Sequence, residues 1–153
     1  MASINEIEVT DIQLNIEAAD RQSAVRKAAQ PLVDTGNITT GYVDEMLDAM
    51  EKLGPYFVIA PGLALAHARP SENVKQTGFS IATFQTPIKF GSAENDPVDI
   101  VIVLASIDSS NHLEMLQKIV GFLNEEKNIA MLREAASMED AVNIALIINK
   151  KGN

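Results

Sequence analysis

The segment Val98-Asp99-Ile100-Val101-Ile102-Val103-Leu104-Ala105 decides the fold class of this chain. Between Ile100 and Leu104 every residue is apolar, so both faces of a strand formed here would be apolar. Such a strand needs helices over both of its faces, whereas a half-exposed strand alternates apolar and polar residues. The segment therefore predicts a central strand in a sheet that helices cover on both sides.

The residues after this strand predict three helices. Ser106 to Ser110 turns the chain into the first helix, whose expected core-facing stripe consists of Leu113, Leu116, Ile119, Val120 and Leu123. The second and third are expected over about Lys127 to Ala136 and Met138 to Asn149.

The residues before this strand alternate between helical and strand-like patterns. Helices are expected from Asp20, with Pro31 indicating a kink or an early end, and from Thr39 or Thr40 to Gly54. Short strands are expected at Ile12–Asn15, Phe57–Ala60, Leu63–Ala66 and Gly78–Phe84, the last ending at Thr86-Pro87. This alternation favours a single α/β domain over residues 1–153.

Composition excludes several classes of protein. The 153 residues are 46% hydrophobic and 22% charged, as in one compact globular domain. The absence of cysteine excludes disulfides and thiol catalysis and favours a reducing, cytoplasmic compartment. A net charge of −9 without a Lys/Arg cluster argues against nucleic-acid binding. No segment approaches the ~18 consecutive apolar residues of a membrane span, so no direct membrane insertion is expected.

His112 lies in the first turn of the helix that follows the central strand. Ligands of open α/β sheets bind beyond the carboxyl ends of strands, and free N–H groups at a helix N-terminus favour an anion. Ser109, Ser110 and Asn111 could add side-chain donors or a cap. The alternative is an ordinary surface histidine at the start of a helix.

His67 follows the small and aliphatic residues Leu63-Ala64-Leu65-Ala66, and Arg69 is close enough to meet a phosphate or carboxylate. A neutral imidazole is a nucleophile, and an ordinary pKa near 6.5 leaves most histidine neutral at pH 7. A covalent phosphoryl-histidine is therefore chemically plausible. The alternative is a histidine at a strand end that only satisfies backbone groups.

Metal and cofactor chemistry are not expected. Neither histidine belongs to a His-x-x-x-His pair, and the sequence has no Gly-x-x-x-x-Gly-Lys phosphate loop and no Gly-x-Ser-x-Gly elbow.

The tract from Gly54 to Pro70 resembles the active-site signature of enzyme IIA components of the sugar phosphotransferase system, in the mannitol/fructose-type (type 2) branch and its ascorbate group. The similarity continues through Val74–Phe79, Glu94–Ile100 and the pair Asp108 and His112, and so spans about Ala24 to Ala141.

This resemblance implies a fold, a reaction and partners. The fold would be a single mixed, mostly parallel sheet with helices on both faces. His67 would accept a phosphoryl group from phospho-HPr and pass it to an enzyme IIB, usually to a cysteine, with the membrane enzyme IIC involved indirectly. His112 would stabilise the phosphoryl group in transfer, and Arg69 is a possible phosphate contact. A histidine that serves docked proteins should lie in a shallow, exposed patch with an apolar rim.

One residue departs from the family pattern. The family usually has proline immediately before the active histidine, and this chain has Ala66, which lacks the fixed φ of proline and has an N–H. Two further functions stay open from sequence: a regulatory phosphoprotein that controls a transcription factor or transporter, and an inactive binding module.

Overall fold

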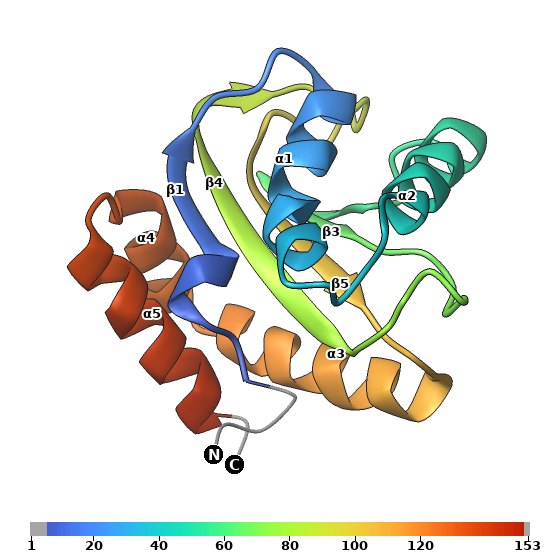
Figure 1. Cartoon of the computed structure of the whole chain (residues 1–153). Coiled ribbons are helices and arrows are strands. Elements are labelled where there is room, and N and C mark those ends of the chain that lie inside the picture. Colours follow the sequence, from blue (N-terminus) through green and yellow to red (C-terminus); the bar gives the residue numbers. More distant parts are fainter. Residues whose placement is uncertain (1–5, 152–153) are drawn as a thin grey trace.

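A computed structural model describes residues 6–151 of the chain. It contains one five-stranded sheet in the order β1-β4-β5-β3-β2, with helices on both faces (Figure 1). The elements in chain order are η1 (Val9–Asp11), β1 (Ile12–Ile16), α1 (Arg21–Asp34), α2 (Thr40–Leu53), β2 (Val58–Ala60), β3 (Leu63–Ala66), β4 (Gly78–Ile88), β5 (Val98–Ala105), α3 (Ser109–Leu123), α4 (Glu126–Glu134) and α5 (Met138–Lys151).

The predicted central strand is β5, the middle strand of the sheet. It pairs in parallel with β3 and antiparallel with β4, while β1 is parallel to β4 and β2 is antiparallel to β3. The expected mixed sheet is thus confirmed, with parallel and antiparallel pairings in equal number rather than a parallel majority. The β3–β5 pairing runs from Leu63 opposite Ile100 to Ala66 opposite Val103, and both strands point toward the same edge.

Two hydrophobic cores lie on opposite faces of the sheet, as the sequence of β5 predicts. Val101 and Val103 belong to the core beneath α1 and α2. Ile100, Ile102 and Leu104 belong to the core beneath α3, α4 and α5. Figure 1 shows these two groups of helices on either side of the sheet.

Helix α1 does not end early at Pro31, because it continues to Asp34. Proline removes one helical hydrogen bond, which here would leave the Lys27 carbonyl without its usual donor. The Gln13 side chain donates to that carbonyl from β1 at 2.7 Å. A contact from the neighbouring strand therefore compensates for the proline.

Strand β4 also runs beyond its predicted end at Thr86-Pro87 and reaches Ile88, which pairs with Val98. Its register with β5 shifts between Thr83 and Ile88. Proline is tolerated in such an irregular stretch because no regular ladder bond is required of its missing N–H.

The predicted core stripe of α3 is wrong in part. Leu113 and Val120 are 56% and 46% exposed. Met115, Ile119 and Phe122 are the buried residues of the helix, so its inner face is rotated from the predicted one.

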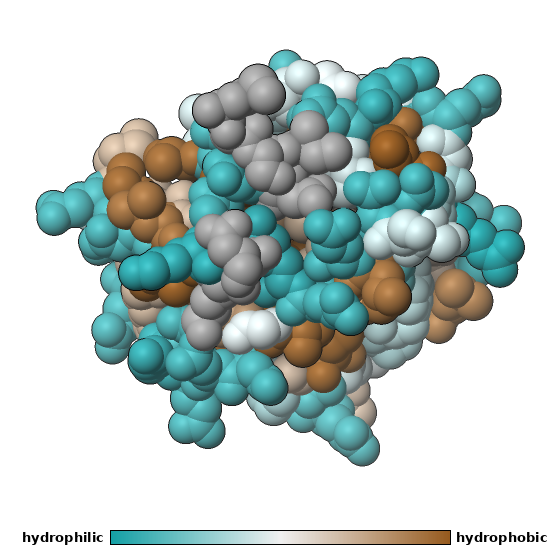
Figure 2. Space-filling model, turned by 90° about the horizontal axis from the view of Figure 1, so that it is seen from below, coloured by the Kyte–Doolittle hydropathy of each residue, from teal (hydrophilic) through white to brown (hydrophobic). Residues whose placement is uncertain are grey.

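Seen from below, the surface of the molecule carries apolar residues in separate patches among hydrophilic ones (Figure 2). Among residues 6–151, no helix is long and apolar enough to span a membrane.

Candidate functional site

His67 lies immediately after β3, where that strand ends beside β5. Its Nδ1 is 3.1 Å from the Leu65 carbonyl oxygen. A carbonyl can only accept a hydrogen bond, so this contact places the proton on Nδ1 and the lone pair on Nε2. The ring packs against Tyr56 and Phe57, with ring centroids 5.6 Å and 5.8 Å away. The backbone contact predicted as the alternative is therefore real, and it leaves one nitrogen free for chemistry.

His112 lies in the first turn of α3, as the sequence predicts, and faces His67 across the end of the sheet. The centroids of the two imidazoles are 5.7 Å apart, with a 54° angle between the rings. Burial, and then the nearby His67, lower the pKa of His112 below its ordinary value of 6.5. Its ring is therefore mostly neutral at pH 7, which suits a hydrogen-bonding partner next to a phosphoryl group.

The cap of this helix differs from the predicted serine or asparagine. Asp108 is the N-cap residue, and its carboxylate accepts a hydrogen bond from the Asn111 N–H at 2.8 Å. Capping bonds hold the Asp108 carboxylate, and they lower its pKa. Ser109 instead lines the pocket next to His112.

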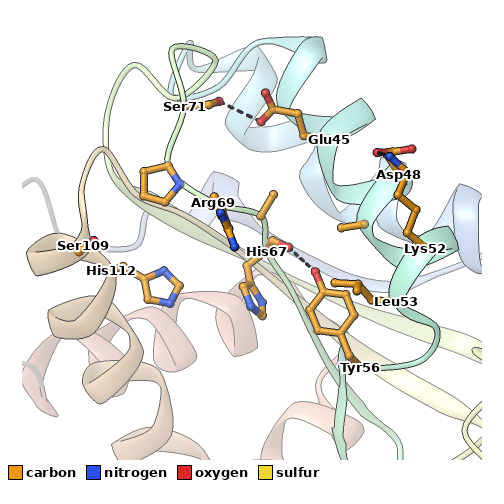
Figure 3. Close-up of a pocket in the computed structure, with 13 residues that line it drawn as sticks. Glu45, Asp48, Lys52, Leu53, Tyr56, His67, Arg69, Ser71, Ser109 and His112 are labelled. Carbon is orange, nitrogen blue, oxygen red and sulfur yellow. Dashed lines mark hydrogen bonds and ion pairs between the residues drawn. The ribbon is translucent and has the colours of Figure 1, made fainter.

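A pocket of about 830 Å³ brings the three predicted site residues together. Figure 3 shows His67 and His112 facing the same opening, with Arg69 nearby. The pocket is lined by Glu45, Asp48, Ala49, Lys52, Leu53, Tyr56, His67, Ala68, Arg69, Pro70, Ser71, Ser109 and His112. Its far wall is therefore α2, the helix expected from Thr39 or Thr40 to Gly54, for which no role in a site was predicted.

Arg69 is exposed at the mouth of this pocket. Among the ion pairs formed within residues 6–151, none involves Arg69. An exposed guanidinium without a carboxylate partner can bind the planar edge of a phosphoryl group through two N–H donors. Lys52, across the pocket, is already paired with Asp48 at 2.9 Å.

Two tyrosines that the sequence analysis did not single out hold the chain around His67. The Tyr56 hydroxyl donates to the His67 carbonyl at 2.9 Å (Figure 3). The buried Tyr42 hydroxyl lies between Ala68 and Leu104. The only sequence signal for Tyr42 was its place beside Val43 at the start of an amphipathic helix, which predicts burial but no polar contact.

The chain beyond Arg69 is fixed to α2 by side-chain hydrogen bonds. Glu45 accepts from the Ser71 hydroxyl and from the Asn73 amide, both at 2.9 Å. The Thr39 hydroxyl and Asn73 Oδ1 are 2.7 Å apart. An alanine at Gly41 would place its Cβ 2.7 Å from Asn73 Oδ1, so glycine permits this close approach.

The site residues together suit the acceptance of a phosphoryl group. Within the described part of the chain, no group of three or more His, Cys, Asp or Glu side chains is placed to hold a metal ion. A nucleophilic Nε2, a neutral imidazole, a free guanidinium and a helix N-terminus form an arrangement that can accept and stabilise a phosphoryl group.

Comparison with known proteins also points to phosphoryl transfer. Residues 6–149 match the family described as the phosphoenolpyruvate-dependent sugar phosphotransferase system, EIIA 2. The ascorbate-specific PTS system EIIA component of Escherichia coli (strain K12) is 40% identical over 134 residues, which is 87% of each chain.

Solved structures show the same fold. The mannitol-specific cryptic phosphotransferase enzyme IIA CmtB from Escherichia coli superimposes with a TM-score of 0.82 at 28% identity, covering 92% of this chain and 94% of that one. The enzyme IIA in a complex with phosphorylated enzyme IIB of the Escherichia coli mannitol system gives 0.79 at 25% identity, with coverages of 92% and 97%.

Proposed function

Because this chain belongs to the EIIA 2 family of the phosphoenolpyruvate-dependent sugar phosphotransferase system, whose members relay phosphoryl groups, we propose that His67 is its phosphoryl-carrying residue. The observation that carries this assignment is the Nδ1 contact of His67 with the Leu65 carbonyl, 3.1 Å long. That contact leaves Nε2 as the nucleophilic atom of a ring that lines the pocket.

The transfer step follows from this tautomer. The Nε2 lone pair attacks the phosphorus of a phosphohistidine on the donor protein, and the Nε2–P bond forms as the donor N–P bond breaks. The electron pair of the broken bond returns to the donor ring. Nδ1 keeps its proton, so its hydrogen bond with Leu65 persists and stabilises the positive charge that develops on the His67 ring. The second transfer reverses these bond changes toward the acceptor protein.

His112 and Arg69 act on the phosphoryl oxygens in this proposal. With its ring centroid 5.7 Å from that of His67, His112 can donate a hydrogen bond to a group carried on Nε2. Arg69 neutralises part of the negative charge from the pocket mouth. Charge stabilisation and positioning account for most catalysis of phosphoryl transfer, so these two side chains and the N-terminus of α3 would suffice.

The partners follow from the family. We propose phospho-HPr as the donor and an enzyme IIB as the acceptor, with the membrane enzyme IIC served indirectly. The complex of a structurally similar enzyme IIA with phosphorylated enzyme IIB supports the acceptor. We also propose that residues 1–153 form a single EIIA 2 domain and that this domain acts in the cytoplasm. The 40% identity to an ascorbate-specific component supports ascorbate as the transported substrate.

The experiment that tests this function is labelling from phosphoenolpyruvate through enzyme I and HPr. Wild type should take up one acid-labile phosphoryl group, and His67→Gln should take up none. His112→Gln, the same change at the second histidine, is the control and should still be labelled. Wild-type labelling of His67→Gln would refute the nucleophile, and an unlabelled wild type would refute the relay function itself.

A further inference from the structure

The hydroxyl of Tyr42 occupies an unusual place between the strand that leads to His67 and the central strand. Tyr42 belongs to α2 and is fully buried. Its hydroxyl accepts a hydrogen bond from the Ala68 N–H at 2.9 Å. The same oxygen lies 3.1 Å from the Leu104 carbonyl and 3.0 Å from the Ala68 carbonyl. One phenolic group therefore touches both the residue after His67 and the end of β5.

The register of β3 on β5 shows what this hydroxyl replaces. The Ile100 N–H donates to the Gly62 carbonyl, and Ala66 lies opposite Val103. In a regular parallel ladder, such a bond alternates with one in which an N–H of β3 donates to a carbonyl of β5, and each kind recurs every two residues along the strands. Continued one step beyond Ala66, this alternation would bring the Ala68 N–H to the Leu104 carbonyl. In the structure, the Tyr42 oxygen stands between that donor and that acceptor, so β3 and β5 separate where His67 begins.

The tyrosine is well suited to this place because it stays neutral. Burial raises the pKa of Tyr42 to about 12, so the phenol keeps its proton throughout the physiological range. A neutral hydroxyl can accept from an N–H and donate to a carbonyl at the same time. A phenylalanine would leave the half-buried Ala68 N–H and the buried Leu104 carbonyl without this partner.

We propose that Tyr42 is a positioning residue for phosphoryl transfer: its hydroxyl replaces one rung of the β3–β5 ladder and fixes where His67 leaves the sheet. This inference rests on the proposed function of His67. Tyr42 does not line the pocket, and it acts only through the backbone on the C-terminal side of the nucleophile.

Ala66 gives this tyrosine its importance. A proline before the histidine would fix one φ angle on the N-terminal side of His67, and Ala66 does not. The segment is held instead from the other side, by Tyr42 at Ala68. Removing the hydroxyl should therefore harm this chain more than it would harm the same chain with proline at position 66.

The test is Tyr42→Phe in rapid-mixing assays of phosphoryl transfer from phospho-HPr, at temperatures where every variant is folded. The rate constant at saturating donor should fall about tenfold, which corresponds to ~1.4 kcal/mol, because misplaced reacting atoms raise the barrier. The apparent dissociation constant of the donor should change less than about twofold.

Ser80→Ala is the matched control. Ser80 is also fully buried, and its hydroxyl donates to the Ala28 carbonyl at 2.6 Å, in the core beneath α1. This change removes a buried hydroxyl without touching the His67 segment. It should lower the melting temperature and leave the transfer rate constant within about twofold of wild type.

Ala66→Pro tests the compensation. Because the pairing of Ala66 with Val103 uses the Ala66 N–H, proline here also removes one β3–β5 hydrogen bond, so its effect is compared between two backgrounds. Relative to its effect in wild type, Ala66→Pro should improve the rate constant at least about threefold in the Tyr42→Phe background. Equal factors in both backgrounds, or a Tyr42→Phe rate constant equal to that of wild type, would overturn the inference. Because labelling of His67 is measured separately, either result would leave the relay function standing.

Discussion

At the scale of single residues, the two imidazoles of the site have different surroundings. His67 is tied through Nδ1 to its own strand at Leu65. The His112 ring centroid lies 5.7 Å from that of His67, and burial lowers the pKa of His112. These two environments suit different roles, because a nucleophile needs a fixed lone pair and a stabilising group needs a donor aimed at the transferred oxygens.

His112→Ala should separate these roles. Labelling of His67 should survive, since the nucleophile and its tautomer are unchanged. Transfer from the labelled protein to an enzyme IIB should slow by roughly tenfold to a hundredfold, because one charge-stabilising hydrogen bond is lost. Quenched-flow decay of the phosphoprotein measures this rate. A wild-type rate in the variant would remove the proposed role of His112.

The placement of both histidines at one end of the sheet could be predicted from the sequence, because each follows an apolar strand, and their roles stay predictions. The direction of the His67 ring could not be predicted. It depends on the carbonyl of Leu65, two residues earlier, and no property of the residue types encodes that contact. Tyr42 was missed for a similar reason, since its apolar neighbours predict burial and say nothing about its hydroxyl.

At the scale of elements, β5 was predictable and the rotation of α3 was not. Five consecutive apolar residues leave a strand no exposed face, so its place in the sheet follows directly. Helix α3 has more apolar positions than its buried face uses. Leu113 and Val120 fall outside that face, and Met115, Ile119 and Phe122 fall within it. Which stripe is buried depends on how α3 packs against α5 and the sheet.

The turn between β2 and β3 offers a test at this scale. Gly62 has φ +75°, and an alanine Cβ there would lie 2.5 Å from Arg133 Nη2 and 2.9 Å from Asp99 Oδ1. Arg133 bridges this turn and β5, with Nε 2.8 Å from Asp99 and Nη2 3.0 Å from the Pro61 carbonyl. Gly62→Ala should therefore strain the backbone and also displace this ion pair.

The matched variant is Gly36→Ala, where φ is +84° and no atom lies within 4 Å of the added Cβ. It should lower the free energy of unfolding by about 1 kcal/mol through backbone strain alone. Gly62→Ala should cost about 1 kcal/mol more, because it also disturbs a partly exposed ion pair and a hydrogen bond. Urea denaturation of both variants measures the difference, and equal losses would contradict the proposed importance of Arg133.

At the scale of the whole molecule, a chain of net negative charge carries a pocket with exposed apolar neighbours. The net charge is −9. Leu53, which lines the pocket, is 66% exposed, and Ile107 and Leu113, on either side of the α3 N-terminus, are 45% and 56% exposed. Leu53 fits the apolar rim expected around a histidine that must meet a docked protein, and Ile107 and Leu113 add exposed apolar area near His112 in the chain. An acidic body also favours encounter with a basic partner.

Leu113→Ser should raise the KM for the donor protein several-fold and leave the rate constant at saturation nearly unchanged, because docking area is lost while His67 is undisturbed. Leu146→Ser is the control, since Leu146 is 63% exposed on α5, which contributes no pocket residue. Steady-state transfer assays measure both. An equal effect of the two substitutions would contradict a rim beside His112.

The contact between His67 and Leu65 has a consequence for the order in which donor and acceptor proteins bind. In the proposed role of His67, Nε2 alone carries the phosphoryl group, which would therefore arrive and leave along the same line. The donor and acceptor proteins would then need the same space and could not be bound together. The two partners would bind one after the other, and an excess of either partner would compete with binding of the other. The rate of sugar uptake would therefore depend on the ratio of the two partners as well as on their amounts.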